Sequence, residues 1–136
     1  MICPIIRDPL FLAGKSEPAT EADRQIIADL LDTLSANSDR CVGMAANMIG
    51  KRKRIIAFCD GPLRIAMVNP RILSKSGAYD AEEGCLSLPG TRRARRYRRI
   101  TVAWQDPSFR PVTGEFEGFT AQIIQHEMDH LDGILI

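Results

Sequence analysis

The sequence predicts an α+β fold in which antiparallel strands surround a metal-binding helix near the C-terminus. Three observations carry this prediction. Apolar residues recur at helical spacing in two segments, at about 21–36 and 118–133. Between these segments lie short apolar runs separated by Gly, Pro and Asp, as is typical of strands joined by turns. The second helical segment carries two histidines four residues apart, which places both imidazoles on one helix face.

At 136 residues the chain is long enough for one domain with its own core, and we assign residues 1–136 to a single domain. The composition, 45% apolar and 26% charged, is that of an ordinary globular protein. No apolar run reaches the length of a membrane span, and the N-terminus lacks a signal-peptide core. Four cysteines without C-x-x-C spacing predict a reduced, cytoplasmic protein. With a net charge of +1, we expect neither a membrane nor DNA as a partner.

The first third of the chain is expected to contain one helix between two irregular segments. Residues 1–19 are interrupted by Pro and Gly, which predicts irregular structure. Thr20 and Asp23 form a capping-box pattern at the start of the helix, and its apolar stripe is assigned to the core. Residues 37–50 are predicted to form a loop of small residues, in which Gly43 would let a substrate backbone approach closely.

The middle of the chain is expected to supply the strands. Apolar and β-branched runs bounded by turn residues predict strands at 54–59, 63–69, 71–76 and 113–117, and a strand at 91–99 that continues through 100–104. The first two are joined by a turn at 60–62, and Asp106-Pro107 should interrupt the chain before the last strand.

The segment Gln125 to His130 fits the pattern H-E-x-x-H and contains the only two histidines of the chain. His126 and His130 can hold one metal ion, while Glu127 reaches the water that the metal activates. The alternative is a helix that carries two histidines without a metal role.

A catalytic site of this kind normally has three protein ligands and one open position. Only Asp132 offers a polar side chain downstream of His130, and it follows His130 too closely to suit the role. The third ligand must therefore be an upstream Cys, Asp or Glu. Cys85 is the best candidate, because a thiolate suits zinc or ferrous iron and Gly84 permits an unusual turn before it. Alternatively, Cys85 is a small buried apolar residue.

Three motifs of this chain resemble, in order, the signature motifs of peptide deformylases. The segments E-G-C-L-S (83–87) and Q-H-E-M-D-H-L (125–131) resemble the second and third, and residues 41–50 resemble the first, G-x-G-x-A-A-x-Q. The resemblance spans essentially the whole chain. It implies a hydrolase that removes the formyl group from N-formylmethionine at the start of a nascent chain, giving formate and a free amine. It also favours Fe²⁺, although the Cys-His-His donor set equally accepts Zn²⁺, Ni²⁺ or Co²⁺.

The resemblance also implies roles for further residues. The main-chain N–H of Leu86 would stabilise the oxyanion that forms from the formyl carbonyl. Val42, Gly43 and Met44 would form the edge along which an extended peptide lies, and Arg92 would contact that peptide. Glu127 would take a proton from the water and pass it to the leaving amine.

Met48 stands where the family pattern has the Gln that supplies the second oxyanion donor. A thioether donates no hydrogen bond, and loss of one such donor costs roughly 100- to 1,000-fold in kcat. Two neighbours could compensate. Asn47 carries an amide next to the position, and Gln122 lies one helical turn before His126 on the same face.

Alternatives follow from this departure. The chain could act on another N-acyl group, or bind formylated peptides or ribosomes without efficient turnover. A metalloprotease is less favoured, because no downstream ligand follows His130. The run Arg92–Arg99 contains six arginines, which are either solvated on an exposed strand or contact RNA phosphates. Because the C-terminal extension of many family members is missing after Ile136, this run is the expected site of a transient ribosome contact.

Overall fold

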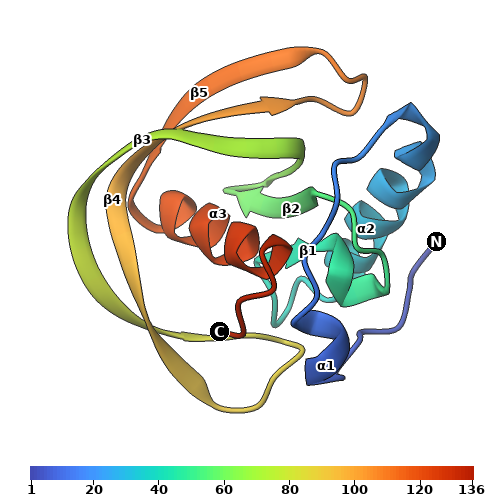
Figure 1. Ribbon diagram of the computed structural model, residues 1–136, viewed down its shortest axis with the longest axis horizontal. Helices are drawn as coiled ribbons and strands as arrows, with labels where there is room; N and C mark the ends of the chain where they lie inside the picture. Colours follow the sequence, from blue (N-terminus) through green and yellow to red (C-terminus); the bar gives the residue numbers. More distant parts are fainter.

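The computed structural model describes residues 1–136 and confirms the predicted α+β fold. A single sheet has the strand order β1-β2-β3-β4-β5, and every neighbouring pair is antiparallel. Figure 1 shows β3 and β4 curving around α3, with α2 outside this enclosure. The strands are β1 (Gly43–Ala45), β2 (Ile55–Asp60), β3 (Leu63–Gly84), β4 (Thr91–Gln105) and β5 (Pro111–Glu117). The helices are α1 (Pro9–Leu12), η1 (Glu21–Asp23), α2 (Arg24–Ala36), η2 (Ala46–Ile49) and α3 (Gly118–Leu131).

The predicted N-terminal helix is confirmed, with a first turn of 3₁₀ type. The main-chain N–H of Thr20 donates to Asp23 Oδ2 at 2.9 Å, as the capping-box pattern predicted. The prediction of irregular structure before it missed α1. This single turn begins at Asp8, whose carboxylate accepts the N–H of Leu10, and Pro9 occupies the first helical position.

The prediction of a loop over residues 37–50 was wrong, because this segment contains β1 and η2. β1 exists only through its pairing with β2, a tertiary contact that local residue pattern does not reveal. Its small residues reflect close packing rather than a turn. A Cβ atom on Gly43 would lie 2.7 Å from Cγ2 of Ile123 on α3. Gly43 therefore lets α3 pack directly against the edge of the sheet.

The prediction of separate strands at 63–69 and 71–76 was also wrong, because β3 is continuous from Leu63 to Gly84. Its register with β4 shifts between Val68 and Arg71, where Asn69 has a φ of 51° and Pro70 can donate no hydrogen bond. The residues at this bulge resemble a turn in sequence, but the strand continues through them. β4 is one continuous strand, as predicted, and the break predicted at Asp106-Pro107 is confirmed.

The side chain of Gln125 on α3 forms two hydrogen bonds with the main chain of β4. Gln125 accepts a hydrogen bond from the N–H of Tyr97 and donates to its carbonyl, both at 2.8 Å. Apolar residues of α3 pack against β1, β2 and β4, so the position of the helix is set by the sheet. The predicted end of this helix at Gly133, which has a φ of 75°, is confirmed. No helix of the chain combines the length and the apolar character required to cross a membrane.

Candidate active site

The structure brings the three predicted metal ligands together. α3 places His126 and His130 one turn apart, and the turn after β3 brings Cys85 to the same point. The ligand atoms of the three residues all lie within 4.8 Å of one another. His130 Nε2 is 3.1 Å from His126 Nε2 and 3.4 Å from Cys85 Sγ. This is a metal-binding group assembled from two elements that are far apart in the sequence.

The donor set fits a divalent transition metal. One thiolate and two imidazoles leave one of four tetrahedral positions for solvent or substrate, as in catalytic sites. The N–H of Ser87 donates to Cys85 Sγ at 3.4 Å and holds this side chain at the site. The chemistry of these donors therefore supports the metal dependence predicted from the sequence.

Glu83 orients the first histidine, and sequence reasoning did not single it out. Its Oε1 lies 2.8 Å from His126 Nδ1, which directs Nε2 of the ring toward the metal position. Burial raises the pKa of Glu83, but hydrogen bonds from His126, Arg96 and Gln122 outweigh this effect and lower it to about 2. The signal available in the sequence was the position of Glu83, an acid two residues before the candidate ligand Cys85.

Arg96 neutralises this buried carboxylate. It donates to both oxygens of Glu83 and to Asp129 Oδ2, the latter at 2.7 Å. The expectation that all six arginines of β4 are exposed is wrong at this position, because Arg96 is 3% exposed. One arginine of the run therefore belongs to the active site and cannot reach an external phosphate.

Glu127 is buried beside the metal-binding group. Its Oε1 atom has no hydrogen-bond partner, and the residue is only 5% exposed. Burial raises the pKa of Glu127 to about 7, against the lowering effect of the nearby His126. A carboxylate with this pKa can both accept and release a proton near neutral pH.

The imidazoles of His126 and His130 cannot both be positively charged at this separation. Burial lowers the pKa of His126, but its interactions with Cys85 and Glu83 outweigh burial and raise it to about 10. Burial and the charge of His126 lower the pKa of His130 to about 3. Metal coordination requires neutral imidazoles, so binding of an ion releases the proton held on His126.

A cavity of about 250 Å³ opens onto these residues. It contains seven of the predicted site residues, from three different segments of the chain. They are Val42, Gly43, Cys85, Leu86, Gln122, His126 and Glu127. The ligand His130 lies beneath this surface, fully buried. The side chain of Met44 does not line the cavity and packs in the core, which leaves only its main chain on β1.

The three residues considered for the oxyanion differ in position. Met48 packs in the core, with its Sδ accepting the N–H of Ala45 at 3.5 Å. The Asn47 amide nitrogen lies 3.0 Å from the carbonyl of His130 and 3.5 Å from that of Leu12, so its hydrogens point away from the cavity. Only Gln122 lines the cavity.

Gln122 is held in place by two neighbours. Its Nε2 donates to Glu83 Oε2 at 2.9 Å, and its Oε1 accepts from the hydroxyl of Tyr79 at 3.3 Å. A primary amide carries two N–H donors, and Glu83 accepts only one of them.

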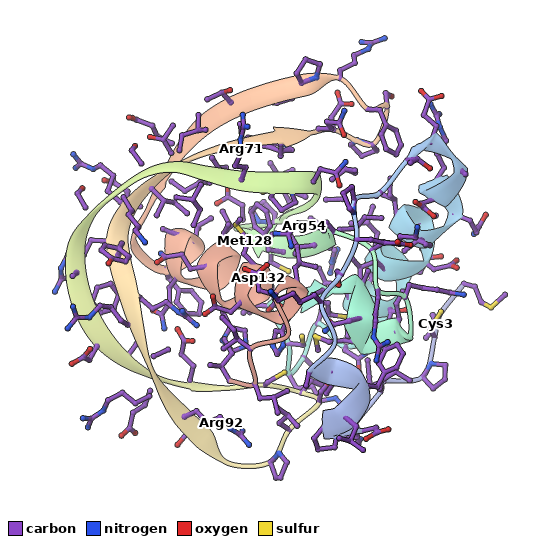
Figure 2. The ribbon with its side chains drawn as sticks, viewed as in Figure 1. Cys3, Arg54, Arg71, Arg92, Met128 and Asp132 are labelled. Atoms are coloured by element: carbon purple, nitrogen blue, oxygen red, sulfur yellow. The ribbon has the colours of Figure 1, made fainter.

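Arg92 does not line the cavity. It lies at the start of β4, where its Nη1 is 3.4 Å from the carbonyl of Pro89 (Figure 2).

Comparison with known proteins decides the family. A sequence model of polypeptide deformylases matches residues 3–136. Over 136 residues the chain is 55% identical to "Peptide deformylase" of Clostridium beijerinckii, with full coverage of both chains. The chain belongs to the polypeptide deformylase family. It is also 38% identical to "Peptide deformylase 2" of Clostridium acetobutylicum over 91% of this chain and 85% of that protein.

Solved deformylase structures have the same fold. The Thermotoga maritima peptide deformylase superposes with a TM-score of 0.88 and 33% identity, covering 99% of this chain and 95% of that one. The class I type b peptide deformylase of Acinetobacter baumannii bound to Met-Ala-Ser superposes with a TM-score of 0.89 and 29% identity, covering 99% of this chain and 97% of that one. The predicted family, fold and enzyme class are confirmed. This deformylase is a metal-dependent hydrolase that removes the formyl group from N-terminal formylmethionine, and the low-activity alternative is not favoured.

Proposed function

We propose that Glu127 is the proton-transferring residue of this deformylase. The observation that carries the proposal is a buried carboxylate with an unpartnered oxygen in the same cavity as the Cys-His-His group. Glu127 accepts a proton from the attacking water and delivers it to the amine as the formyl C–N bond breaks. The water oxygen leaves in formate. A divalent ion bound by Cys85, His126 and His130 supplies Lewis-acid chemistry at this point.

The oxyanion donors are proposed to be the main-chain N–H of Leu86 and the second amide hydrogen of Gln122. Leu86 lines the cavity directly after the ligand Cys85. Gln122 lines it from α3, and its hydrogen bonds to Glu83 and Tyr79 hold its amide in one orientation. A preorganised donor of this kind stabilises charge without rearranging during the reaction.

The substrate is proposed to lie along β1 as an added strand. β1 is an end strand of the sheet, and Val42 and Gly43 line the cavity beside it. An extended peptide can pair with such an edge through its main chain. Gly43 and Met44 would supply main-chain contacts, and Arg92 would reach the part of the peptide farther from the metal.

Fe²⁺ is the proposed metal in the cell, with Zn²⁺, Ni²⁺ or Co²⁺ as substitutes that the same donors accept. The cytoplasm is the proposed compartment, where nascent formylated chains are made and thiols stay reduced. The four cysteines of the chain are free, which suits this environment.

Formate release from a formyl-Met peptide tests the proposed roles, with anaerobic, iron-loaded protein. Glu127→Gln should lose at least about 100-fold in kcat while it retains metal. Gln122→Ala should lose about 100-fold if its amide is an oxyanion donor. Gln122→Glu keeps the size and removes the donor, so it should resemble Gln122→Ala. Full turnover in Glu127→Gln, or in both Gln122 variants, would contradict the respective role.

The same assay applied to Met48→Gln tests the missing donor. Because Gln122 is proposed to supply the second donor, Met48→Gln should leave kcat within a few fold of the wild type. A rise approaching about 100-fold would mean that the wild type lacks this donor and would contradict the role of Gln122. Met48→Leu is the matched control, because it keeps the apolar volume and adds no donor. Equal kcat values for Met48→Gln and the wild type would mean that another group already fills this role.

A transient ribosome contact is proposed for the exposed arginines of β4. Arg93, Arg95 and Arg98 are exposed, although Arg95 has Asp80 at 3.8 Å and Arg98 stacks on Tyr79. Their charge supports contact with RNA phosphates, which weakens as salt rises. Co-sedimentation with ribosomes should fall in Arg93→Ser/Arg95→Ser and stay unchanged in Arg110→Ser. Equal co-sedimentation of all three proteins would remove this proposal.

A further inference from the structure

The free edge of β1 is already partly hydrogen bonded within the chain. The N–H of Cys59 on β2 donates to the carbonyl of Val42 at 2.8 Å. In an antiparallel ladder the direction of the main-chain groups alternates, so Val42 and Met44 bond toward β2. Gly43 and Ala45 therefore direct their N–H and C=O groups away from β2, toward the free edge.

Two sulfur atoms occupy this edge. The thiol of Cys41 donates to the carbonyl of Gly43, with Sγ and O 2.9 Å apart. The thioether of Met48 accepts the N–H of Ala45 at 3.5 Å. These contacts agree with the alternation deduced from the ladder. The carbonyl of Gly43, which an added strand would use as its acceptor, thus has a partner before any peptide arrives.

The cavity at this edge contains a buried carboxylate oxygen without a hydrogen-bond partner. Cys41 and Gly43 line it together with Glu127, whose Oε1 is buried and has no partner. We propose that Cys41 sets the affinity for peptide substrates, because its thiol occupies the Gly43 carbonyl in the free protein and is displaced when a peptide pairs with β1. This inference rests on the proposed binding of the peptide along β1.

The exchange is favourable because the two donors differ in strength. A thiol is a weak donor, whereas a peptide N–H forms a full hydrogen bond with a carbonyl. Burial raises the pKa of Cys41 to about 12, so the thiol keeps the proton that it donates throughout the neutral range. Each bound peptide must replace this contact, which affects KM rather than the chemical step. Only a substrate with an N–H that reaches Gly43 should show the effect.

Steady-state kinetics on the iron-loaded enzyme test the proposal with formyl-Met-Ala-Ser. Cys41→Ala should lower KM for the tripeptide about threefold and leave kcat unchanged. Cys41→Ser keeps a donor, and its KM should stay within about twofold of the wild type. Cys59→Ala is the control, because Cys59 packs in the same core and does not line the cavity. An unchanged or raised tripeptide KM in Cys41→Ala would overturn the proposal.

Infrared spectroscopy of the zinc-loaded wild type provides a readout that does not depend on catalysis. The S–H stretching band of Cys41 is assigned by its absence in Cys41→Ala. Saturation with the product peptide Met-Ala-Ser should shift this band to the frequency of a free thiol. A shift without formate release in the kinetic assay would retain the thiol exchange and reject the proposed catalysis. A band that does not move, whether the peptide binds or fails to bind in calorimetry, would overturn the exchange.

Discussion

His126 Nδ1 lies 2.8 Å from Oε1 of Glu83, and this contact joins the metal-binding helix to the end of β3. The carboxylate fixes the ring so that Nε2 faces Cys85 and His130. Arg96 in turn binds the same carboxylate, so that a buried ion pair lies behind the metal site. The orientation of His126 thus depends on a buried carboxylate whose charge is balanced by the Arg96 guanidinium.

Substitution of Glu83 should therefore weaken metal binding. Glu83→Gln retains the size of the side chain but removes the negative charge that orients His126 and pairs with Arg96. Loss of such an outer-shell partner typically lowers metal affinity about 10- to 100-fold. Zinc affinity is measured by competition with a chromophoric chelator. Glu82→Gln alters an exposed neighbour and should bind zinc as the wild type does; equal affinity in all three proteins would refute the role of Glu83.

Addition of a methyl group at Gly43 should displace the catalytic carboxylate. Its Cβ would lie 2.9 Å from Glu127 Oε2 and 2.7 Å from Cγ2 of Ile123. We expect Gly43→Ala to lower kcat by about 100-fold and to keep the metal, which elemental analysis can verify. Gly84→Ala adds a methyl to the opposite wall, where the nearest atom is 3.7 Å away. A comparable loss in both variants would mean that the cavity rejects any added volume.

The thiol of Cys41 should react slowly with iodoacetamide. Burial raises its pKa from 9.0 to about 12, so less thiolate is present at any pH below that value. At about pH 8 the thiolate fraction falls about 1,000-fold, and the higher intrinsic nucleophilicity recovers about 20-fold. Peptide mass mapping should show alkylation about 50-fold slower than in the urea-unfolded chain, rising tenfold per pH unit. Equal rates in the folded and unfolded chains would exclude the raised pKa.

The same pKa shift makes stability depend on alkaline pH. The folded state holds the Cys41 proton above pH 9, where the unfolded chain has begun to lose it. Unfolding then releases a proton, so the free energy of unfolding falls as the pH rises from about 9 toward 12. Urea titrations should show a smaller decline for Cys41→Ala over this interval. A decline of the same size in both proteins would assign the effect to other groups.

Asn69 should contribute to stability through the N-terminal segment. Its side chain accepts the N–H of Ala19 and donates to the carbonyl of Ala19 and to Gln105 Oε1. Asn69→Ala leaves these groups unpaired at a φ of 51°, and we expect a loss of about 2 to 3 kcal/mol in the free energy of unfolding. Asn69→Gly adopts the positive φ without strain but also lacks the hydrogen bonds. Its loss in the free energy of unfolding should therefore be smaller than that of Asn69→Ala and still measurable. Wild-type stability of Asn69→Ala in urea titration would refute this role.

The sequence by itself determined the candidate residues for the chemistry. H-E-x-x-H, the absence of a downstream ligand and the Cys85 motif depend on local spacing, and helical periodicity converts such spacing directly into geometry. The approximate positions of β2, β4 and β5 and the ends of α3 followed from turn residues in the same way. The family resemblance then connected these positions to deformylation, which the comparisons confirmed.

Only the tertiary structure decided how the site is supported. β1 was predicted as loop because a three-residue strand exists only through its partner, and β3 was divided at a bulge that the β4 ladder spans. Arg96 belonged by pattern to an exposed run, yet the curvature of β3 and β4 turns it inward to Glu83. The sulfur contacts at the edge of β1 likewise depend on ladder alternation. Such features depend on contacts between segments that are distant in the sequence, and local residue spacing carries no information about these contacts.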